Sequence, residues 1–203
     1  MSTQIRHFIT PLPARELDRY LNSGWRPAGQ GIYTADFLRA DDEEIYGCIQ
    51  VRLPLENFAF KKRHRKILNR NNPNFKVTYN RATEPDEELL ELNRRYMAVH
   101  PDKTREDLDL HVTGEYLVRV LDTRIVRVYD GDKLVAFSYV DLGEETAYTK
   151  AGIYDPEYAR FSLGIYTMLL EIAWLKEKGI SFYHPGYISP RYAVFDYKLQ
   201  FGD

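Results

Sequence analysis

The stretch "RIVRVYDGDKLVAFSYVDLGEETAYTKAGIYD", residues 124–155, decides the fold of this chain. Two runs rich in apolar residues, 124–130 and 133–143, flank Gly131-Asp132. An Asp-Gly turn between such runs is a strong short-range signal of a β-hairpin. A third strand is expected over residues 145–155. The stretch therefore predicts a meander of three neighbouring strands.

A long amphipathic helix is expected next, over residues 162–179, with Gly179 as its C-terminal stop. Its apolar face is formed by Leu163, Tyr166, Leu169, Leu170 and Ala173. Residues 180–187, "ISFYHPGY", are typical of a short apolar strand, and "YAVFDYKLQF" at 192–201 is expected as a last strand. The second half of the chain is thus predicted as β-β-β-α-β-β.

The first half carries weaker patterns of the same kind. Strands are expected over residues 31–38, 45–55 and 74–83. Helices are expected over residues 14–24, 86–100 and 115–122. A basic segment at residues 60–72 lies between the second and third of these strands.

The order of the second half, a meander followed by a helix and a parallel strand, resembles the acetyltransferase-like (GNAT-like) α/β fold. The first half is interpreted as a degenerate copy of it. We therefore expect an α/β (α+β) protein of two packed GNAT-like halves, residues 1–84 with the basic segment and residues 85–203. Because no linker or low-complexity segment divides them, the halves should pack as one unit.

Composition and charge limit the kind of protein. The chain has 203 residues, a formal net charge of -2 and a single cysteine, Cys48. A single cysteine cannot form a disulfide within the chain, and it cannot by itself form a cysteine-based metal site. No stretch approaches the roughly 18 apolar residues that span a bilayer, and residues 1–15 lack the apolar core of a secretory signal. We expect a cytoplasmic protein without a membrane partner.

The basic segment "FKKRHRKILNRNN", residues 60–72, stands out against this near-neutral charge. Its cations are Lys61, Lys62, Arg63, Arg65, Lys66 and Arg70. On a helix they would cover most of the circumference, leaving Ile67 and Leu68 as anchors. Such a cluster neutralises nucleic-acid phosphates whatever the net charge. The alternative is a solvated helix paired with the acidic segments at residues 39–44 and 84–88.

Seven short motifs follow one another along the chain in an order that is typical of one protein family. They are GWR (24–26), CIQVRLPL (48–55), Phe58 with the basic helix ending in Asn71, RRYMAVH (94–100), LVAFSYVD (134–141), YDPEYARFSLGIY (154–166), and GY (186–187) followed by Tyr197-Lys198. In order and spacing the chain resembles the arginyl-tRNA–protein transferase family, including its bacterial leucyl-transferring relatives. The series YDP, SLGIY, GY and YK is the strongest part.

The resemblance implies an enzyme that modifies protein N-termini to create N-degrons. It would transfer an amino acid, with arginine or leucine as the expected donor, from charged tRNA to the N-terminal amine of an acceptor protein. Its partners would be the aminoacyl-tRNA and that N-terminus, and no cofactor beyond the charged tRNA is implied. Two alternatives stay open, an acyl-CoA-dependent N-acetyltransferase of the same fold and a catalytically inactive RNA-binding relative.

The chain departs from the family in two places. Of the family's cysteines it keeps only the one in its CxxxR position, Cys48 to Arg52. The other positions are filled by residues such as Asp36, Phe37 and Asp41. The family's metal or iron–sulfur site should therefore be absent, and we expect no metal ligands. Val194 and Phe195 stand where the family usually places a lysine and a methionine, which bears on substrate preference and activity.

The chemistry that the resemblance implies needs an amine and an activated ester held together, a proton acceptor and an oxyanion site, but no enzyme nucleophile. Gly164, in "SLGIY" at the start of a helix, would let a ligand approach free backbone N–H groups. The coenzyme A loop of acetyltransferases is broken here, since "RFSLGIY" has one glycine. The alternative is that Gly164 only permits close packing.

The remaining candidates gather near the predicted cleft. Tyr187 and Tyr197 could orient the ester or relay a proton, and Lys198 could meet an acidic acceptor side chain or the 3′-terminal phosphate. His184 is a candidate general base. Substrate-binding positions are assigned to Tyr166, Gly186, Asp155 and Arg160. The alternatives are half-buried rings with satisfied hydroxyls, a hydrogen-bonded imidazole and an ordinary Asp-Pro turn.

Overall fold

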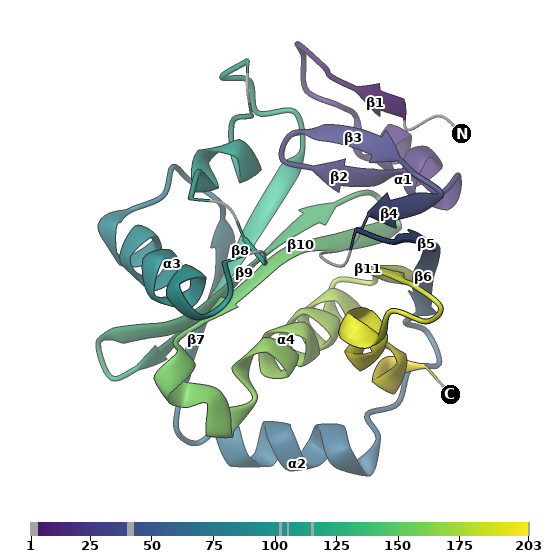
Figure 1. Ribbon diagram of the computed structural model, residues 1–203. Helices are drawn as coiled ribbons and strands as arrows, with labels where there is room; N and C mark the ends of the chain where they lie inside the picture. Colours follow the sequence, from purple (N-terminus) through teal and green to yellow (C-terminus); the bar gives the residue numbers. More distant parts are fainter. Residues whose placement is uncertain (1–3, 40–42, 102, 105, 115, 203) are drawn as a thin grey trace.

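A six-stranded sheet forms the centre of the structure, a computed structural model that describes residues 4–39, 43–101, 103–104, 106–114 and 116–202. Its strands, in spatial order, are β6 (Ile49–Pro54), β11 (Phe182–Ile188), β10 (Thr146–Tyr154), β9 (Lys133–Leu142), β8 (Asp122–Asp130) and β7 (Lys76–Arg81) (Figure 1). All neighbours are antiparallel except β10 and β11. The hairpin of β8 and β9 turns at Gly131, whose φ of 58° suits glycine, as predicted.

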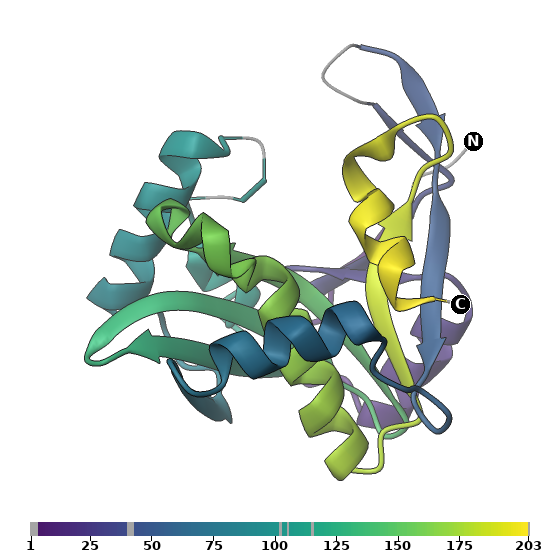
Figure 2. The same ribbon diagram turned by 90° about the horizontal axis from the view of Figure 1, so that it is seen from below.

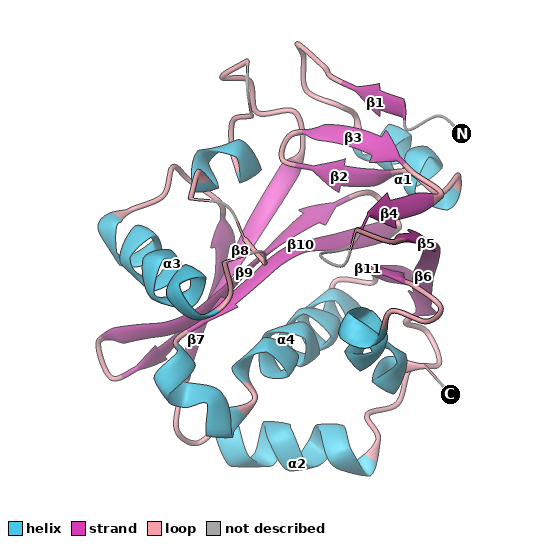
Figure 3. Cartoon of the chain, in the orientation of Figure 1, coloured by secondary structure: helices cyan, strands magenta, loops and turns pink. Residues whose placement is uncertain are grey.

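Helices cover both faces of this sheet (Figure 3). One face carries α3 (Glu87–Val99) and α1 (Ala14–Asn22), and the other carries α4 (Leu163–Glu177) with α2 (Lys62–Asn71) packed on it. Alternation along the strands produces the two cores: on β9, Phe137 faces α3 whereas Ala136 faces α4. Figure 2 shows α2 crossing the outer side of α4. No helix in the described residues is long and apolar enough to span a membrane.

Smaller elements surround one end of the sheet. The strands β1 (Gln4–Arg6), β3 (Gly31–Thr34) and β2 (Arg26–Ala28) form a small sheet, and β4 (Phe37–Arg39) pairs with β5 (Ile45–Gly47). The strand expected over residues 31–38 is divided into β3 and β4, which belong to different sheets. The strand expected over residues 45–55 is likewise two strands, β5 and β6. They break at Cys48, whose amide donates to the carbonyl of Asp36 at 2.7 Å. Three 3₁₀ helices complete the described part of the chain: η1 (Leu108–His111), η2 (Pro156–Phe161) and η3 (Ala193–Phe201).

Two further expected elements are wrong in type. The helix expected over residues 115–122 does not form in the described residues 116–122, because the Gln30 side-chain oxygen accepts from the amides of Val120 and Leu121, each at 2.7 Å. These two apolar residues pack against α1 instead. The last expected strand, residues 192–201, is η3. Lys198 and Phe201 lie three residues apart and are both buried, which matches a helical period and not an alternating one.

The order β-β-β-α-β expected for residues 124–187 is confirmed by β8, β9, β10, α4 and β11. The expected division between residues 84 and 85 runs through one sheet, because β6 and β7 pair with strands of the second half. That the first half is a degenerate copy of the second stays a prediction.

The parallel strands β10 and β11 stay together for only part of their length. Their pairing covers residues 146–148 and 182–184. Beyond it β10 continues with β9 alone and β11 with β6 alone. The carboxyl ends of the two strands therefore diverge, and η2 and the first turn of α4 follow directly after β10. Open α/β sheets bind ligands at such positions.

Candidate active site

A cavity of about 850 Å³ lies where β10 and β11 diverge. Its walls come from both strands, from the end of α3, from the first turns of α4 and from η3. Five of the predicted site residues line it: Gly164, Gly186, Tyr187, Tyr197 and Lys198. Residues of the SLGIY and PGY motifs thus border one cavity. The roles assigned to them stay predictions.

The first turn of α4 presents backbone donors to this cavity. Ser162 has the left-handed φ of 55°, and its carbonyl accepts from the amides of Ile165 and Tyr166 at 3.1 and 3.0 Å. The N–H groups of Leu163 and Gly164 precede these first helical bonds. Of the two residues, Gly164 lines the cavity, whereas Leu163 is fully buried. A Cβ added at Gly164 would lie 3.4 Å from the Tyr154 ring, so close packing also applies there.

Lys198 is the most unusual side chain of the cavity. Only 7% of it is exposed, and its Nζ donates to the carbonyl of Tyr187 at 2.8 Å. The rings of Tyr187, Phe195 and Tyr197 surround the ammonium, with centroids 5.0, 4.9 and 5.7 Å from Nζ. Burial, followed by the charge of Arg26, lowers the pKa of Lys198 to about 8. A cation in a ring of aromatic faces can meet an anion or exchange a proton near neutral pH.

Gly186 makes room for that lysine. Its φ is 98°, and a Cβ there would lie 3.0 Å from Lys198 Nζ and 3.6 Å from the Tyr148 hydroxyl. A side chain would therefore be strained in the backbone and would push Lys198 aside. The PGY motif therefore leaves room for the cation, and its residues also line the cavity.

Arg26 lies behind Tyr187 and was not predicted as a site residue. Its side chain is 2% exposed, and its guanidinium carbon lies 4.4 Å from the Tyr187 ring centroid and 4.9 Å from that of Tyr33. One nitrogen donates to the carbonyl of Ala35 at 2.7 Å. Among the described residues neither Arg26 nor Lys198 forms an ion pair. The GWR motif, which ends at Arg26, was the available signal.

Four predicted residues lie outside the cavity lining. His184 is 2% exposed, and neither ring nitrogen has a hydrogen-bond partner among the described residues. Burial lowers its pKa to about 4. Tyr166 faces the core, where its hydroxyl donates to Asn72 Oδ1 at 3.0 Å. Both side chains are buried and lie outside the cavity lining, which differs from their expected positions in the cleft.

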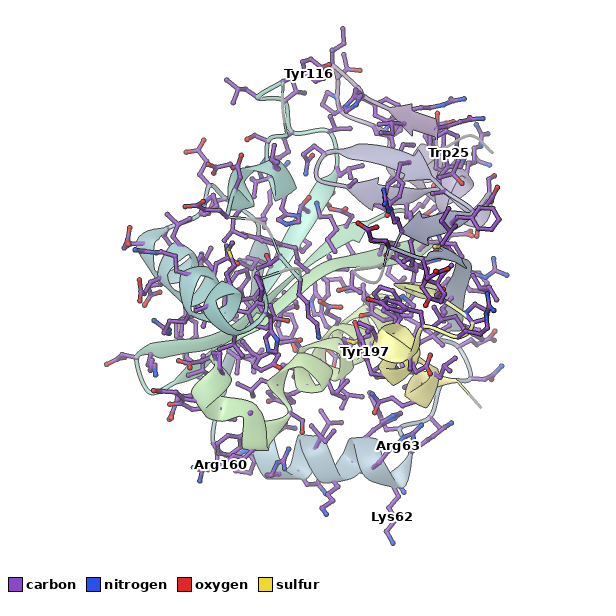
Figure 4. All side chains as sticks on the ribbon, viewed as in Figure 1. Trp25, Lys62, Arg63, Tyr116, Arg160 and Tyr197 are labelled. Atoms are coloured by element: carbon purple, nitrogen blue, oxygen red, sulfur yellow. The ribbon has the colours of Figure 1, made fainter. Side chains whose placement is uncertain are left out.

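Asp155 and Arg160 belong to η2. The Asp155 side chain accepts from the Glu157 amide at 3.1 Å and pairs with Lys133 at 3.0 Å. It starts the 3₁₀ helix, as an ordinary Asp-Pro turn does. Arg160 is exposed, with its guanidinium carbon 4.8 Å from the Phe161 ring centroid. Figure 4 places Arg160 at the edge of the molecule near α2, whereas Tyr197 lies near the centre.

The basic segment forms the predicted helix, α2, but its charges do not cover the circumference. His64 is buried and stacks on Phe58 and Phe201, and Asn71 donates to the carbonyl of Phe161 at 2.9 Å. Cations at both ends of the helix donate to backbone carbonyls of neighbouring segments. These bonds join Lys61 to Gly202, Arg63 to Gln200 and Arg70 to Phe161.

The outer side of α2 keeps its charge in water. Lys62 and Lys66 are exposed, and Lys62 projects away from the molecule in Figure 4. Arg65 donates to the carbonyl of Phe60, which lies just before its own helix. Within the described residues no carboxylate pairs with any cation of α2. The pairing with the acidic segments, which was the alternative interpretation, is therefore not seen there, although residues 40–42 of the first segment lie outside the described residues.

The residues at the family's cysteine positions do not fit a metal or an iron–sulfur cluster. Cys48 is one half-buried thiol, and burial raises its pKa despite the nearby Arg26. Asp36 and Phe37 are described, while Asp41 lies outside the described residues. In the described part of the chain no three His, Cys, Asp or Glu side chains gather as metal ligands would. The absence of a metal stays a prediction.

Solved structures of other proteins share the fold. The C-terminal domain of a putative lysylphosphatidylglycerol synthetase from Agrobacterium fabrum superposes with a TM-score of 0.57 at 15% identity, covering 91% of this chain and 60% of that one. FemX superposes with a TM-score of 0.55 at 10% identity, covering 92% and 65%. The predicted α/β, acetyltransferase-like class is confirmed.

Curated relatives match nearly the whole chain. The aspartate/glutamate leucyltransferase of Leptospira interrogans (strain Fiocruz L1-130) is 26% identical over 205 residues, which is 97% of this chain and 76% of the relative. The enzyme of the same name from Campylobacter jejuni (strain RM1221) is 24% identical over 199 residues, 96% of this chain and 81% of the relative.

A sequence profile described as "Arginine-tRNA-protein transferase, C terminus" matches residues 78–203, more than half of the chain. The match includes η3, the first turn of α4 and both diverging strands, so it contains most of the cavity. The predicted resemblance is confirmed: the chain belongs to the arginine-tRNA–protein transferase family.

Proposed function

We propose that this protein transfers leucine from charged tRNA to the N-terminal amine of an acceptor protein whose first residue is acidic. Family membership supports transfer from an aminoacyl-tRNA to a protein. The donor and the acidic acceptor are suggested by relatives named aspartate/glutamate leucyltransferase.

The observation that carries the acceptor assignment is the buried, unpaired Lys198. A buried cation without an anion opposes folding, and a carboxylate that docks beside it forms a charge-assisted hydrogen bond. Lys198 lines the cavity, while Arg26 adds positive potential from behind Tyr187. The side chain of an N-terminal Asp or Glu would supply the missing negative charge and hold its own α-amine inside the cavity.

The first turn of α4 would stabilise the reacting ester. The acceptor nitrogen attacks the ester carbonyl carbon, a C–N bond forms, and the C–O bond to the tRNA ribose breaks. The amine proton ends on the departing ribose oxygen. Negative charge that develops on the carbonyl oxygen is stabilised by preorganised N–H donors. The amide of Gly164, which precedes the first helical hydrogen bonds of α4, is such a donor at the cavity wall.

The exposed side of α2 would hold the tRNA. Lys62 and Lys66 have no carboxylate partner among the described residues, and Arg160 extends the positive surface beyond the far end of the helix (Figure 4). Contacts of this kind neutralise phosphates and carry little sequence information. The donor identity would then be read at the aminoacyl end and not on α2.

One transfer assay tests the proposal. Purified protein is offered tRNA charged with labelled Leu, Arg or Phe, together with peptides that begin with Asp, Glu, Arg or Lys. We expect product from Leu-tRNA with the Asp and Glu peptides. Lys198→Met should raise KM for these peptides, whereas Lys178→Met, at an exposed position just after α4, should not. Product with Arg- or Lys-initiated peptides, or none with any donor, contradicts the proposal.

A further inference from the structure

Glu171 is a fully buried carboxyl group beneath the cavity that the steps above do not use. It lies on α4 and is 0% exposed. The Tyr183 hydroxyl donates to Oε2 at 2.6 Å, and Thr149 Oγ1 lies 3.4 Å from Oε1. Within the described residues it has no ion-pair partner. A buried acid without a cation requires an explanation.

Thr149 connects this carboxyl group to the cavity. Thr149 lies on β10 just where β11 diverges, is only partly buried, and lines the cavity. The other partner, Tyr183, is 0% exposed and belongs to the core between α4 and the sheet. The Ser138 hydroxyl also faces this carboxyl group, but Ser138 is buried and does not line the cavity. Of the three hydroxyl groups around Glu171, those of Tyr183 and Ser138 therefore belong to the closed core, and that of Thr149 belongs to a residue that a ligand can reach.

The surroundings of Glu171 keep both of its protonation states accessible. Burial raises its pKa to about 7. The titratable groups that face it are phenols: Tyr183 from β11, Tyr197 from η3 and Tyr79 from β7. Burial raises the pKa of each of these phenols as well, so they stay neutral at pH 7. Carboxyl groups with a pKa near the working pH suit proton transfer in both directions.

We propose that Glu171 stores the proton of the transfer reaction and exchanges it with the substrate through the Thr149 hydroxyl. This inference rests on the proposed function. When the acceptor nitrogen attacks, its proton passes to Thr149 Oγ1, whose own proton passes to Glu171 Oε1. When the C–O bond breaks, the proton returns along the same path to the ribose oxygen. No net proton is gained or lost, which suits a group enclosed by protein.

The test compares pH profiles of single-turnover transfer from Leu-tRNA to an Asp-initiated peptide. Glu171→Gln keeps the size and the hydrogen-bonding shape but holds no proton. We expect its rate to fall on the order of 100-fold. Its profile should also lose the inflection near pH 7, while the limb due to the acceptor amine, near pH 8, remains.

Variants along the path separate a relay from a structural acid. Thr149→Val should reproduce the loss of rate and of the lower inflection, and Thr149→Ser should restore both. Thr167→Val is the matched control. Thr167 lines the same cavity, but its hydroxyl donates to the Gly164 carbonyl at 3.1 Å and not to Glu171. It should keep the inflection near pH 7.

The outcomes distinguish this inference from the proposed function. If wild type transfers leucine and Glu171→Gln or Thr149→Val keeps both rate and inflection, the relay is wrong and the function stands. A slower variant with an unchanged inflection also overturns the relay. If wild type transfers nothing, both fail. Should Glu171→Gln not fold, carbon NMR of the wild-type carboxyl groups decides: Glu171 must titrate near pH 7, and Thr149→Val must move that titration.

Discussion

Two regions of the molecule hold positive charge in opposite ways. At the cavity, Lys198 and Arg26 are almost excluded from solvent and lack carboxylate partners among the described residues. On α2, Lys62 and Lys66 stand in water, and the cations nearer the ends of the helix donate to backbone carbonyls.

The difference separates selectivity from affinity. A buried cation opposes folding until an anion of the right shape arrives, so it selects among ligands. An exposed cation contributes little to stability, is screened by salt, and attracts any polyanion. The cavity should therefore decide which acceptor reacts, and α2 should decide how tightly a tRNA is held.

The largest change in stability is expected from Lys198→Met. Burial lowers the pKa of Lys198 from 10.5 to about 8, so its contribution to stability is present above pH 10.5 and lost as the pH falls through 8. At pH 7 the protonated lysine costs up to about 3 kcal/mol. Lys198→Met should raise the free energy of unfolding by that amount at pH 7, and urea titrations should show the gain shrinking toward pH 10. If wild type and Lys198→Met have equal free energies of unfolding at pH 7, the cost of burying the charge of Lys198 is already offset within the folded protein.

The second prediction concerns His184, a buried imidazole that stays neutral in the folded protein. Its pKa falls from 6.5 to about 4, chiefly through burial, so its contribution to stability is present above pH 6.5 and lost as the pH falls toward 4. At pH 5 the loss is about 2 kcal/mol. His184→Leu removes two unpaired ring nitrogens and should flatten this part of the stability curve. If wild type and variant lose stability in parallel between pH 6.5 and 5, the imidazole is not buried as described.

Gly186→Ala should disturb the cavity cation through the backbone. The residue has a φ of 98°, and the new Cβ would meet Lys198 Nζ at 3.0 Å. We expect a loss of about 2 kcal/mol together with slower transfer. Gly131→Ala is the matched control, because Gly131 has a φ of 58° with nothing within 4 Å of the added Cβ. It should cost about 1 kcal/mol and leave transfer unchanged. If calorimetry gives a lower Tm for Gly131→Ala than for Gly186→Ala, the claim that residue 186 packs closely against Lys198 is wrong.

Changes on α2 should have the smallest effect on stability. Lys62→Gln with Lys66→Gln should weaken binding of every charged tRNA alike. Each lost contact should make the log–log salt slope shallower by about 0.7 to 0.9. The Tm should not move, because both side chains are exposed. Arg63 is left in place, since it donates to the carbonyl of Gln200. Unchanged tRNA affinity and slope would assign α2 to a charged surface without an RNA role.

Local patterns predicted the fold where local chemistry decides it. The Asp-Gly turn and the helical period of residues 162–179 led to β8, β9 and α4. The prediction of a helix over residues 115–122 was wrong because Gln30, some 90 residues away, accepts hydrogen bonds from the amides of Val120 and Leu121. A contact between such distant positions leaves no trace in the local pattern.

The candidate site also has a part that local sequence patterns predicted and a part that they could not predict. Glycines and aromatic residues in short motifs marked the cavity, and Lys198 was found with them. Arg26 and Glu171 were missed, because being charged, buried and unpaired is a property of the packed structure. A weak signal existed for Glu171, a lone acidic residue inside the apolar run "MLLEIAWL" at residues 168–175.

The most direct test of the central claim compares two peptides that differ only in charge, one beginning with Asp and one with Asn. Their kcat/KM values for transfer from Leu-tRNA are measured for wild type and Lys198→Met, at low and high salt. We predict that wild type prefers the Asp peptide on the order of 100-fold at both salt concentrations. The variant should lose this preference while keeping its tRNA affinity. A variant that still prefers Asp would contradict the claim that the buried cation selects the acceptor.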